Sequence, residues 1–359
     1  MKKTVVVGMS GGVDSSVAAK LLIDGGYNAV GLFMRNWDED DGGECTAAAD
    51  WRDAQAVCGK LGIPCYSVNF AKEYRQSVFD SFLDEYRAGR TPNPDVLCNR
   101  EIKFGPFASY AKKLGADYIA TGHYCGILHG APGGARLLKA ADANKDQTYF
   151  LNAVRTEQLN GVLFPLADLT KSAVRAIAEK CGLPTAKKRD STGVCFIGER
   201  DFKRFLQNYL PNKKGNIVDK SGNVLGVHDG LMYYTPGQRR GLNIGGVRGC
   251  GAGRWYVTDK RPDTNELVVS NGEGGELFSR SLECGPINII GADGFGDKFA
   301  CTAKTRYRQS EQNAVVTRTA VGASVEFEKP QRAVTPGQYV VFYVGNRCLG
   351  GAVINSVGR

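Results

Sequence analysis

Ser10-Gly11-Gly12-Val13-Asp14-Ser15-Ser16 is the stretch of this chain that decides its fold. Residues 4–7, Thr-Val-Val-Val, come just before it and form a β-branched run that predicts a buried strand. The apolar residues between Val17 and Leu22 follow it at the spacing of a buried helix face. A strand, a glycine turn and a helix N-terminus in this order predict an anion site, because free backbone N–H groups and the positive end of the helix dipole converge there.

The residues of this loop favour phosphate as the anion. Gly11 and Gly12 allow a tight turn and a close approach of phosphate to the backbone, and the hydroxyls of Ser10, Ser15 and Ser16 add donors. No segment reads G-x-x-x-x-G-K-[ST], so the lysine of a Walker motif is absent. The alternative is a glycine turn that only connects a strand to a helix.

Length and composition indicate an ordinary multidomain globular protein. With 359 residues, the chain is expected to form two or three domains. Its 42% hydrophobic and 23% charged residues are typical of that class. No apolar run approaches the roughly 20 residues that span a bilayer, and the first strand begins at Thr4, which leaves no room for a signal peptide. We therefore expect a cytoplasmic protein with no membrane partner.

The cysteine and histidine pattern predicts no resident metal. The chain has 11 cysteines and three histidines, and no two cysteines are spaced as C-x-x-C. Cys125 lies two residues after His123, but no second ligand pair at zinc spacing accompanies it. A structural disulfide framework is not expected in the cytoplasm. Most of the cysteines are therefore interpreted as small buried apolar residues.

The positive charge is unevenly placed along the chain. The net charge is +9, and residues 187–260 hold 14 Lys and Arg against six Asp and Glu. A basic surface attracts polyanions such as nucleic acids. A solvated surface without a partner is the alternative.

The first 200 residues alternate strand-like and helix-like segments. We expect strands at residues 4–7, 29–33, 66–68 and 118–121, and helices at residues 51–61, 73–88 and 106–114. This alternation predicts an α/β fold with a parallel sheet covered by helices on both faces. A ligand of such a sheet binds beyond the C-terminal strand ends, where the Ser10 loop would lie.

The character of the chain changes after two further expected helices at residues 172–181 and 201–209. Beyond Gly215, short strand-like runs at residues 216–219, 267–270, 314–318 and 339–344 are separated by glycine-rich turns, which is an all-β pattern. The turn residues 271–272 and 274–275 suggest a boundary between two β-rich units. We therefore predict domains at residues 1–200, 201–272 and 273–359.

Cys98 is a candidate reactive thiol. It lies in Thr-Pro-Asn-Pro-Asp-Val-Leu-Cys-Asn-Arg, residues 91–100, where two prolines predict an extended chain before a helix that begins near Cys98. A thiol at a helix N-terminus, close to Arg100 and Lys103, would have a depressed pKa. Asp95 lies three residues away and is suited to proton transfer. The alternative is a buried cysteine beside a helix cap.

Cys195 is a second candidate thiol. Glycines bracket it in Thr-Gly-Val-Cys-Phe-Ile-Gly, residues 192–198, and basic residues precede the segment at 187–189. This setting would suit a thiolate presented to an anionic partner. A small buried cysteine in a connecting loop remains the alternative.

The segments S-G-G-V-D-S-S, N-P-D-x-x-C-N and G-x-C-F-I-G together resemble the family of bacterial tRNA-specific 2-thiouridylases, which is a branch of the N-type ATP pyrophosphatases with a PP-loop. Further segments agree with this resemblance at residues 120–124, 144–150, 237–239, 304–309 and 335–338. The resemblance therefore covers nearly the whole chain. It implies an ATP-pyrophosphatase domain, a small central domain and a C-terminal β-barrel.

The resemblance also implies a reaction. The substrate would be the wobble uridine of tRNAs for Lys, Glu and Gln, and ATP would adenylate the O2 oxygen of its uracil. Cys195 would carry a persulfide received from a sulfur-donor protein, and its terminal sulfur, or sulfide released from it, would attack C2. Cys98 would resolve the persulfide and leave a disulfide with Cys195, while Asp95 would be the acid/base residue.

Site residues follow from the same resemblance, one position at a time. Residues that would contact ATP, which would be accompanied by Mg²⁺, are Gly8, Met9, Ser10, Gly11, Gly12, Val13, Asp14, Ser15, Met34 and Gly122. Residues that would meet the target base or other parts of the tRNA are Asn93, Pro94, Asp95, His123, Lys145, Asp146, Gln147, Arg306, Tyr307 and Gln338. Alternatively, Arg306 and Tyr307 are an exposed strand pair, and His123 is an ordinary interior histidine.

Three other functions are compatible with parts of the sequence. An enzyme that adenylates a small metabolite would need the loop but neither Cys98 nor Cys195. A tRNA-binding protein without catalysis would not need a complete pyrophosphate loop. A thiolating enzyme with an iron–sulfur cluster would be expected to show C-x-x-C spacing, which is absent here.

Overall fold

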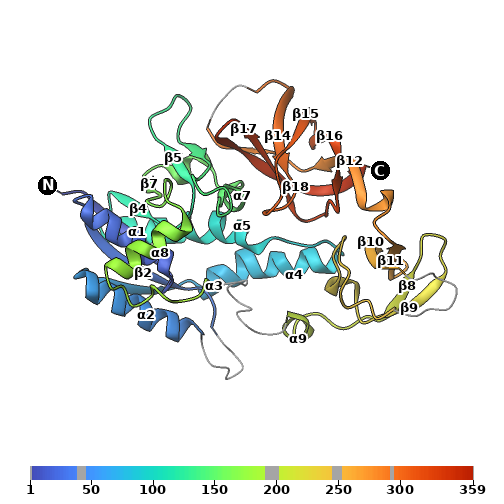
Figure 1. Cartoon of the computed structure of the whole chain (residues 1–359), viewed down its shortest axis with the longest axis horizontal. Coiled ribbons are helices and arrows are strands. Elements are labelled where there is room, and N and C mark those ends of the chain that lie inside the picture. Colours follow the sequence, from blue (N-terminus) through green and yellow to red (C-terminus); the bar gives the residue numbers. More distant parts are fainter. Residues whose placement is uncertain (1, 39–45, 191–201, 245–252, 292–294, 359) are drawn as a thin grey trace.

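The computed structural model describes residues 2–38, 46–190, 202–244, 253–291 and 295–358 of the chain. Figure 1 shows three regions: a parallel sheet with helices on the left, a barrel at the upper right, and a small sheet at the lower right. Within the described ranges, no helix combines the length and the apolar character needed to cross a bilayer.

The N-terminal region is an α/β layer structure, as the alternating pattern predicted. Its five strands are all parallel, in the order β3 (Cys65–Asn69), β2 (Asn28–Arg35), β1 (Thr4–Met9), β4 (Tyr118–Ala120) and β7 (Val162–Leu163). Val5 and Val7 of β1 pack against α1 (Val13–Asp24) and α2 (Thr46–Leu61), whereas Val6 faces the opposite layer. Both faces of the central strand are thus covered, which explains why it is a continuous apolar run.

The opposite layer is built from short helical segments in series. The single helix expected at residues 73–88 is α3 (Ala71–Tyr74), a π-helical segment (Arg75–Phe79) and α4 (Asp80–Arg87). Next come α5 (Pro94–Cys98), a second π-helical segment (Asn99–Lys103) and α6 (Pro106–Lys113). Further along the chain, α7 (Thr148–Leu151) and α9 (Phe202–Gln207) contribute to the same core, whereas α8 (Lys171–Lys180) packs against α1.

The prediction that a helix begins near Cys98 is wrong. The helix α5 begins at Pro94, and Asn93 caps it by accepting a hydrogen bond from the Val96 N–H at 3.4 Å. Proline is well suited to the first helical position because its missing N–H would have no partner there, and asparagine is a preferred cap. Cys98 is therefore the last residue of α5, not the first.

Two β-structures form the second half. The central sheet has the order β10 (Trp255–Arg261), β11 (Glu266–Asn271), β8 (Gly215–Val218) and β9 (Val224–His228). The barrel has the order β12 (Phe278–Cys284), β16 (Gly322–Arg332), β15 (Gln312–Thr319), β14 (Lys298–Lys304), β17 (Tyr339–Val344) and β18 (Arg347–Gly358), and it closes through pairing of β12 with β18. A C-terminal β-barrel is confirmed.

One hairpin joins the two halves of the molecule. The strands β5 (Gly126–Leu128) and β6 (Arg136–Leu138) follow the parallel sheet in sequence, but β6 pairs with β18 of the barrel. A short strand β13 (Asn288–Ile289) also pairs with β18. The barrel is thereby held to the N-terminal region by main-chain hydrogen bonds as well as by side-chain packing.

Candidate active site

The phosphate loop lies between β1 and α1, at the C-terminal edge of the parallel sheet. The helix α1 begins at Val13, and its cap residue Gly12 provides no side-chain hydrogen bond. Gly11 has a φ of +71°, and a Cβ at this position would lie 2.4 Å from the carbonyl oxygen of Asp50. Glycine is thus required by backbone conformation and by space, and the helix N-terminus is open to an anion.

Three serine hydroxyls brace the loop from within. The Ser15 hydroxyl accepts a hydrogen bond from the Ser10 N–H at 3.2 Å and donates one to the Gly12 carbonyl at 3.1 Å. The Ser16 hydroxyl donates to the same carbonyl at 2.8 Å, and its side chain is fully buried. Ser10 is exposed and is the most accessible of the three hydroxyls.

The sheet brings the other predicted ATP contacts to the same edge. Gly8 and Met9 end β1, Met34 lies near the end of the neighbouring β2, and Gly122 follows β4 on the other side. Gly122 packs directly on the first turn of α1, since a Cβ there would lie 2.8 Å from the Ser15 nitrogen. Parallel strands place all of their C-terminal ends at one edge, so these distant residues converge.

Lys171, which no sequence motif indicated, lies at this loop. Both carboxylate oxygens of Asp14 accept hydrogen bonds from the Lys171 ammonium, at 2.7 and 2.8 Å. The Tyr124 hydroxyl donates to the same carboxylate at 2.7 Å, and burial together with this carboxylate raises the pKa of Tyr124. Lys171 is the first residue of α8, and its side chain is only 14% exposed. It supplies a fixed positive charge beside a loop that has no Walker lysine.

Asp190 connects this lysine to two more cations. Its carboxylate accepts from Lys145 at 2.7 Å and Arg175 at 2.8 Å, and it lies 2.8 Å from the Lys171 ammonium. Burial raises the pKa of Asp190, but hydrogen bonds from Lys145 and Lys171 more than offset this and hold the pKa at about 2. Asp190 is therefore ionised at any physiological pH, and it joins a predicted tRNA contact, Lys145, to the phosphate loop.

Lys188 supports the loop from the other side. Its ammonium donates to the Gly11 carbonyl at 3.0 Å and to the carboxylates of Asp50 and Asp53, at 2.7 and 2.5 Å. The sequence reading had treated this residue only as part of a basic flank. No local spacing predicts these contacts, because the partners are more than 130 residues apart in the chain.

The helix α5 carries Asp95 and Cys98 one turn apart, and positions three apart on a helix are neighbours on one face. Burial raises the pKa of Asp95, and the positive charge of Lys103 offsets this only partly. Cys98 is 2% exposed and belongs to the main apolar core. Cys195 lies outside the described residues, so its position relative to Cys98 is not described.

The predicted tRNA contacts of the N-terminal region differ in exposure. His123 is buried, its Nδ1 lies 2.7 Å from the Thr121 hydroxyl, and burial lowers its pKa well below the ordinary value. Asp146 is also buried and accepts from the Thr148 hydroxyl at 2.7 Å. Pro94 is likewise buried, whereas Asn93, Lys145 and Gln147 are partly exposed. As tRNA contacts, all of these residues stay predictions.

The predicted contacts Arg306 and Tyr307 of the barrel have structural partners. One nitrogen of Arg306 donates to the carbonyls of Pro236 and Ala333 and to the Thr335 hydroxyl, at 2.9, 2.8 and 3.1 Å, and burial lowers its pKa. Tyr307 packs on Phe150 with ring centroids 4.5 Å apart. The simple picture of an exposed strand pair does not describe them. Their contact with tRNA remains a prediction.

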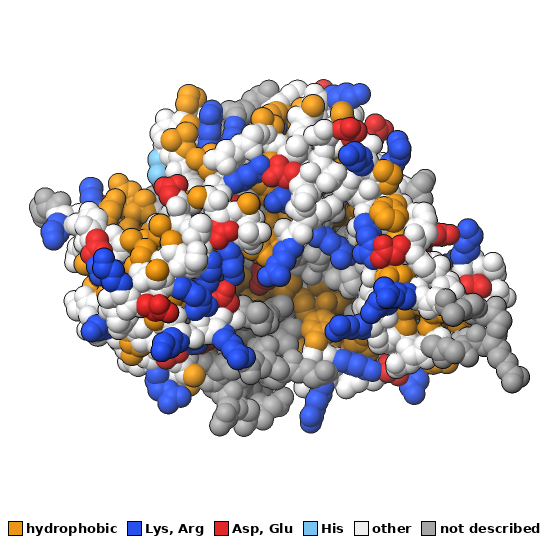
Figure 2. Space-filling model, in the orientation of Figure 1, with side chains coloured by type: hydrophobic (Ala, Val, Ile, Leu, Met, Phe, Trp, Pro, Cys, Tyr) orange, Lys and Arg blue, Asp and Glu red, His pale blue; other side chains and the backbone are white. Residues whose placement is uncertain are grey.

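Lys and Arg side chains gather around a hollow in the middle of one face (Figure 2), between the N-terminal region and the two β-regions.

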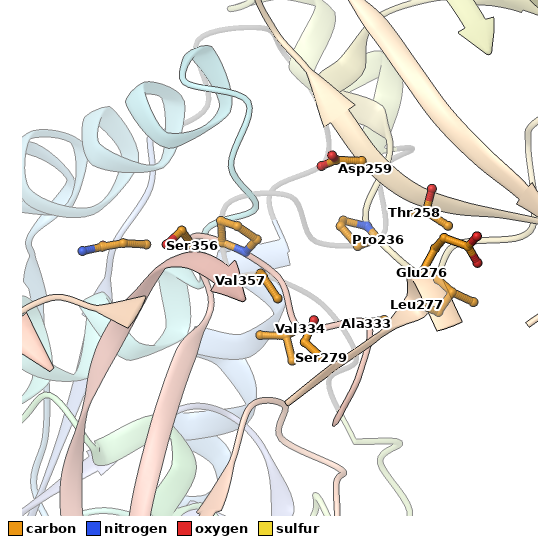
Figure 3. Close-up of a pocket in the computed structure, with 12 residues that line it drawn as sticks. Pro236, Thr258, Asp259, Glu276, Leu277, Ser279, Ala333, Val334, Ser356 and Val357 are labelled. Atoms are coloured by element: carbon orange, nitrogen blue, oxygen red, sulfur yellow. The ribbon is translucent and has the colours of Figure 1, made fainter. Parts of the chain in front are cut away.

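A separate cavity of about 440 Å³ lies between the central sheet and the barrel (Figure 3). Within the described part of the chain, no group of three or more His, Cys, Asp or Glu side chains is arranged to hold a metal ion.

The structure has an α/β domain, with a candidate phosphate loop after its first strand, followed by two β-domains. Family models match in the same order: a tRNA methyl transferase HUP domain at residues 3–199, a tRNA methyl transferase PRC-barrel domain at residues 203–271, and an aminomethyltransferase β-barrel domain at residues 279–354.

Curated relatives identify the family. The tRNA-specific 2-thiouridylase MnmA of Pseudomonas fluorescens is 57% identical over 355 residues, which cover 98% of this chain and 95% of the relative. A tRNA-specific 2-thiouridylase of Geobacillus kaustophilus is 56% identical over 359 residues, which cover 99% of this chain and 96% of the relative. The chain belongs to the tRNA-specific 2-thiouridylase family of enzymes.

A solved structure, the U34-tRNA thiolase NcsA from Methanococcus maripaludis, matches 54% of this chain and 62% of its own length. Its TM-score is 0.36 and its sequence identity is 21%, so this likeness is too weak to support an inference.

Proposed function

We propose that this chain uses ATP to place sulfur on C2 of the wobble uridine of tRNAs for Lys, Glu and Gln. The observation that carries the proposal is the identity of 57% with a tRNA-specific 2-thiouridylase over 98% of the chain. A relationship of this length includes the loop, α5 and both β-domains. Since its substrate would be tRNA, we place the reaction in the cytoplasm.

The first step would be adenylation. The O2 oxygen of uracil attacks the α-phosphorus of ATP, the bond to the β-phosphate bridging oxygen breaks, and pyrophosphate leaves. The open N-terminus of α1 would bind the leaving phosphates through backbone N–H groups, and Lys171 would compensate part of their charge. The product is uridine with AMP on O2, which makes C2 open to attack.

Mg²⁺ would enter as part of the ATP substrate. Asp14 is the carboxylate of the loop, and both of its oxygens are already hydrogen-bonded by Lys171. The phosphate oxygens would therefore have to supply most of the ligands of a bound Mg²⁺.

The second step would be sulfur transfer. A persulfide on Cys195, received from a donor protein, provides the sulfur that attacks C2 and expels AMP. Cys98 attacks the inner sulfur of Cys195, which breaks the S–S bond and forms a Cys98–Cys195 disulfide. In the alternative order, this attack releases sulfide first, and sulfide attacks C2. In both orders a thiol reductant returns the two cysteines to the reduced state by supplying two electrons.

Asp95 would handle the proton of the target base, and Asn93 and Pro94 would lie against that base. Burial that raises the pKa of Asp95 supports this role, because proton transfer is most effective when the pKa approaches the working pH. The basic and aromatic residues Lys145, Arg306 and Tyr307 are of the types that bind phosphate and unpaired bases.

The test is a reconstitution with ATP, bulk tRNA and a persulfide-bearing donor protein, or inorganic sulfide in its place. We expect 2-thiouridine after digestion of the tRNA to nucleosides, together with one AMP and one pyrophosphate for each thiolated base. Asp14→Ala should lower all three yields together. Release of ADP and orthophosphate as the tRNA-dependent products would contradict the proposal.

A further inference from the structure

The tetrapeptide Thr-Pro-Gly-Gln occurs twice in the chain, at residues 235–238 and 335–338. In both copies the glycine has a left-handed φ, +84° at Gly237 and +89° at Gly337. In both copies the glutamine N–H donates to the threonine carbonyl, at 2.9 and 3.2 Å. The two copies therefore form the same turn.

The turns are also attached to their domains in the same way. Residues 237–238 exchange two backbone hydrogen bonds with Val257 of β10 in the central sheet, at 2.7 and 2.9 Å. Residues 337–338 do the same with Ile354 of β18 in the barrel, at 2.9 and 2.8 Å. Each β-domain thus presents one copy of this turn.

The glutamine side chains differ between the copies. Gln238 serves its own domain, since its Oε1 accepts from the Thr235 N–H at 3.1 Å and its Nε2 donates to the Arg240 carbonyl at 2.9 Å. Gln338 leaves its domain: its Nε2 donates to the carbonyls of Thr91 and Pro92, at 2.8 and 3.0 Å.

Thr91 is the point where all three regions of the molecule meet. Its N–H donates to the Pro336 carbonyl at 3.0 Å, and its hydroxyl lies 3.4 Å from the Thr235 hydroxyl. The approach is close, because a Cβ on Gly337 would lie 2.9 Å from both the nitrogen and the oxygen of Thr91. The prolines of both turns, Pro236 and Pro336, line the cavity of Figure 3.

The segment that Gln338 holds leads directly into α5. Asn93 caps this helix through Val96, and the Asn93 amide nitrogen also lies 3.5 Å from the Gln338 Oε1. Asp95 is the second residue of the helix. A shift of residues 91–93 would therefore move the Asp95 carboxyl.

We infer that Gln338 is a positioning residue, which ties residues 91–93 to the barrel and thereby sets the place of Asp95 for the reaction. This inference rests on the proposed function for its catalytic part, but the positioning itself is a property of the protein without tRNA. It assigns to the barrel a direct part in the geometry of the active site. Gln238 of the central domain lies in the same kind of turn, but its side-chain hydrogen bonds go to Thr235 and Arg240 of its own domain, so we assign it no role in positioning Asp95.

The first measurement is hydrogen exchange of the full-length protein without tRNA or ATP, followed by mass spectrometry of a peptide that covers residues 90–98. Gln338→Leu should speed exchange in this peptide about tenfold, since two hydrogen bonds to its backbone are lost. The matched control Gln238→Leu removes the side-chain bonds of the twin turn and should leave the peptide unchanged. Unchanged exchange in Gln338→Leu would overturn the inference.

The second measurement is turnover and tRNA affinity of the same variants. Gln338→Leu should lower kcat at saturating tRNA on the order of 10- to 100-fold, as expected for a displaced catalytic group. Because Gln338 is also a predicted tRNA contact, the Kd for tRNA is measured separately, and a loss of affinity with normal kcat would overturn the link of Gln338 to Asp95.

A further variant guards against simple misfolding. Gln338→Glu keeps the length of the side chain but places a carboxylate against two carbonyl oxygens, so it should reproduce the faster exchange while remaining folded by circular dichroism. Failure of the proposed function would be seen separately: wild type would form no 2-thiouridine although its amides at residues 90–98 are protected from exchange. In that case the exchange rates of the Gln338 variants would still decide whether Gln338 positions residues 91–93.

Discussion

Asp14 and Asp95 are the two carboxylates that we place in the reaction, and their surroundings are opposite. Asp14 is held by a lysine at 2.7 and 2.8 Å and by a tyrosine hydroxyl at 2.7 Å. Asp95 lies on a short helix among apolar residues, and burial raises its pKa despite the charge of Lys103. Asp14 thus has direct cationic and hydroxyl donors, whereas burial of Asp95 favours its protonated form.

The difference separates the molecule into two working regions. Around the phosphate loop, Lys145, Lys171, Arg175, Lys188 and their acidic partners keep fixed charges in place, which suits a polyphosphate substrate. Around α5, the chain offers a buried thiol and a carboxyl whose pKa is raised by burial, which are the groups that proton and sulfur chemistry would need. Substitutions in one region should therefore change its own chemistry and leave the other region unaffected.

The largest effect is expected from the two thiols. Cys98→Ser and Cys195→Ser should each lower thiolation with a protein persulfide donor to background, because a hydroxyl can neither carry nor attack a persulfide sulfur. Both variants should still bind ATP and tRNA. Peptide mass analysis of wild type without reductant should detect the Cys98–Cys195 disulfide.

Cys181→Ser is the control, since this half-buried thiol has no role in the scheme and should cost about 1 kcal/mol of stability at most. Full thiolation by the Cys98/Cys195 double serine variant would refute the sulfur chemistry assigned to α5.

Asp95→Asn should lower kcat about 10²- to 10⁴-fold, the range for loss of an acid/base group. If Asp95 acts as the base, wild-type activity falls as pH drops through its pKa, which burial raises above the ordinary 3.8. The variant should lack this limb of the pH profile. Retention of the same limb in Asp95→Asn would assign it to another group.

The raised pKa of Asp95 also predicts how the unfolding stability of wild type and Asp95→Asn should differ with pH. Since the folded state holds the proton to higher pH than the unfolded chain, stability falls as pH rises from 3.8 toward the raised pKa. Asp95→Asn should therefore be more stable than wild type at neutral pH, and the gain should vanish below pH 3.8. Urea unfolding at several pH values measures it.

Lys171→Met tests the charged region. It leaves Asp14 and Asp190 without their shared cation, next to the place where phosphates would bind, so pyrophosphate formation should fall on the order of 10- to 100-fold. Arg175→Met is the comparison variant, because it removes another partner of Asp190 together with hydrogen bonds to the carbonyls of Ala186 and Lys188. A loss in Lys171→Met no larger than in Arg175→Met would contradict a direct effect of Lys171 on the loop.

Lys145→Ala should weaken tRNA binding several-fold and reduce the slope of log affinity against log salt by about 1, as expected for one phosphate contact. Lys20→Ala is the control, since Lys20 pairs with Asp24 in the last turn of α1, away from the loop. Filter binding at several salt concentrations separates the two. An unchanged slope in Lys145→Ala would remove this residue from the tRNA surface.

The smallest effect is expected at Asp190. Its folded pKa of about 2 lies below the ordinary 3.8, so it contributes stability above pH 3.8 that is lost as pH falls through 2. Asp190→Asn should cost on the order of 1 kcal/mol at neutral pH, after allowance for solvent screening of a partly exposed network. Denaturant curves should show a smaller difference between wild type and Asp190→Asn near pH 2.5 than at pH 7.

Local patterns predicted the longer helices and eight of the eighteen strands in the described residues, namely β1–β4, β8, β11, β15 and β17. The β-branched run before the loop, the glycines within it and the apolar spacing after it identified β1, the phosphate turn and α1 in place. The strand at residues 339–344 was predicted at the bounds of β17. Such signals lie within a few neighbouring residues, so they survive in any tertiary context.

Errors arose where local signals competed. The helix bearing Cys98 begins four residues earlier than predicted, because Asn93 and Pro94 form a cap and a first turn that had been interpreted as extended chain. The expected helix at residues 73–88 contains a π-helical segment, which apolar spacing does not reveal.

The sequence by itself therefore determined the class of fold, the phosphate loop, the family and the identity of the candidate thiols and carboxylates. Only the tertiary structure decided that Lys171 and Asp190 belong to the loop, that the hairpin β5–β6 extends the barrel sheet, and that one of two identical turns holds the segment before α5. The physical reason is that these contacts join residues tens to hundreds of positions apart. No period or spacing in a sequence encodes such partners, and packing of separately predicted elements selects them.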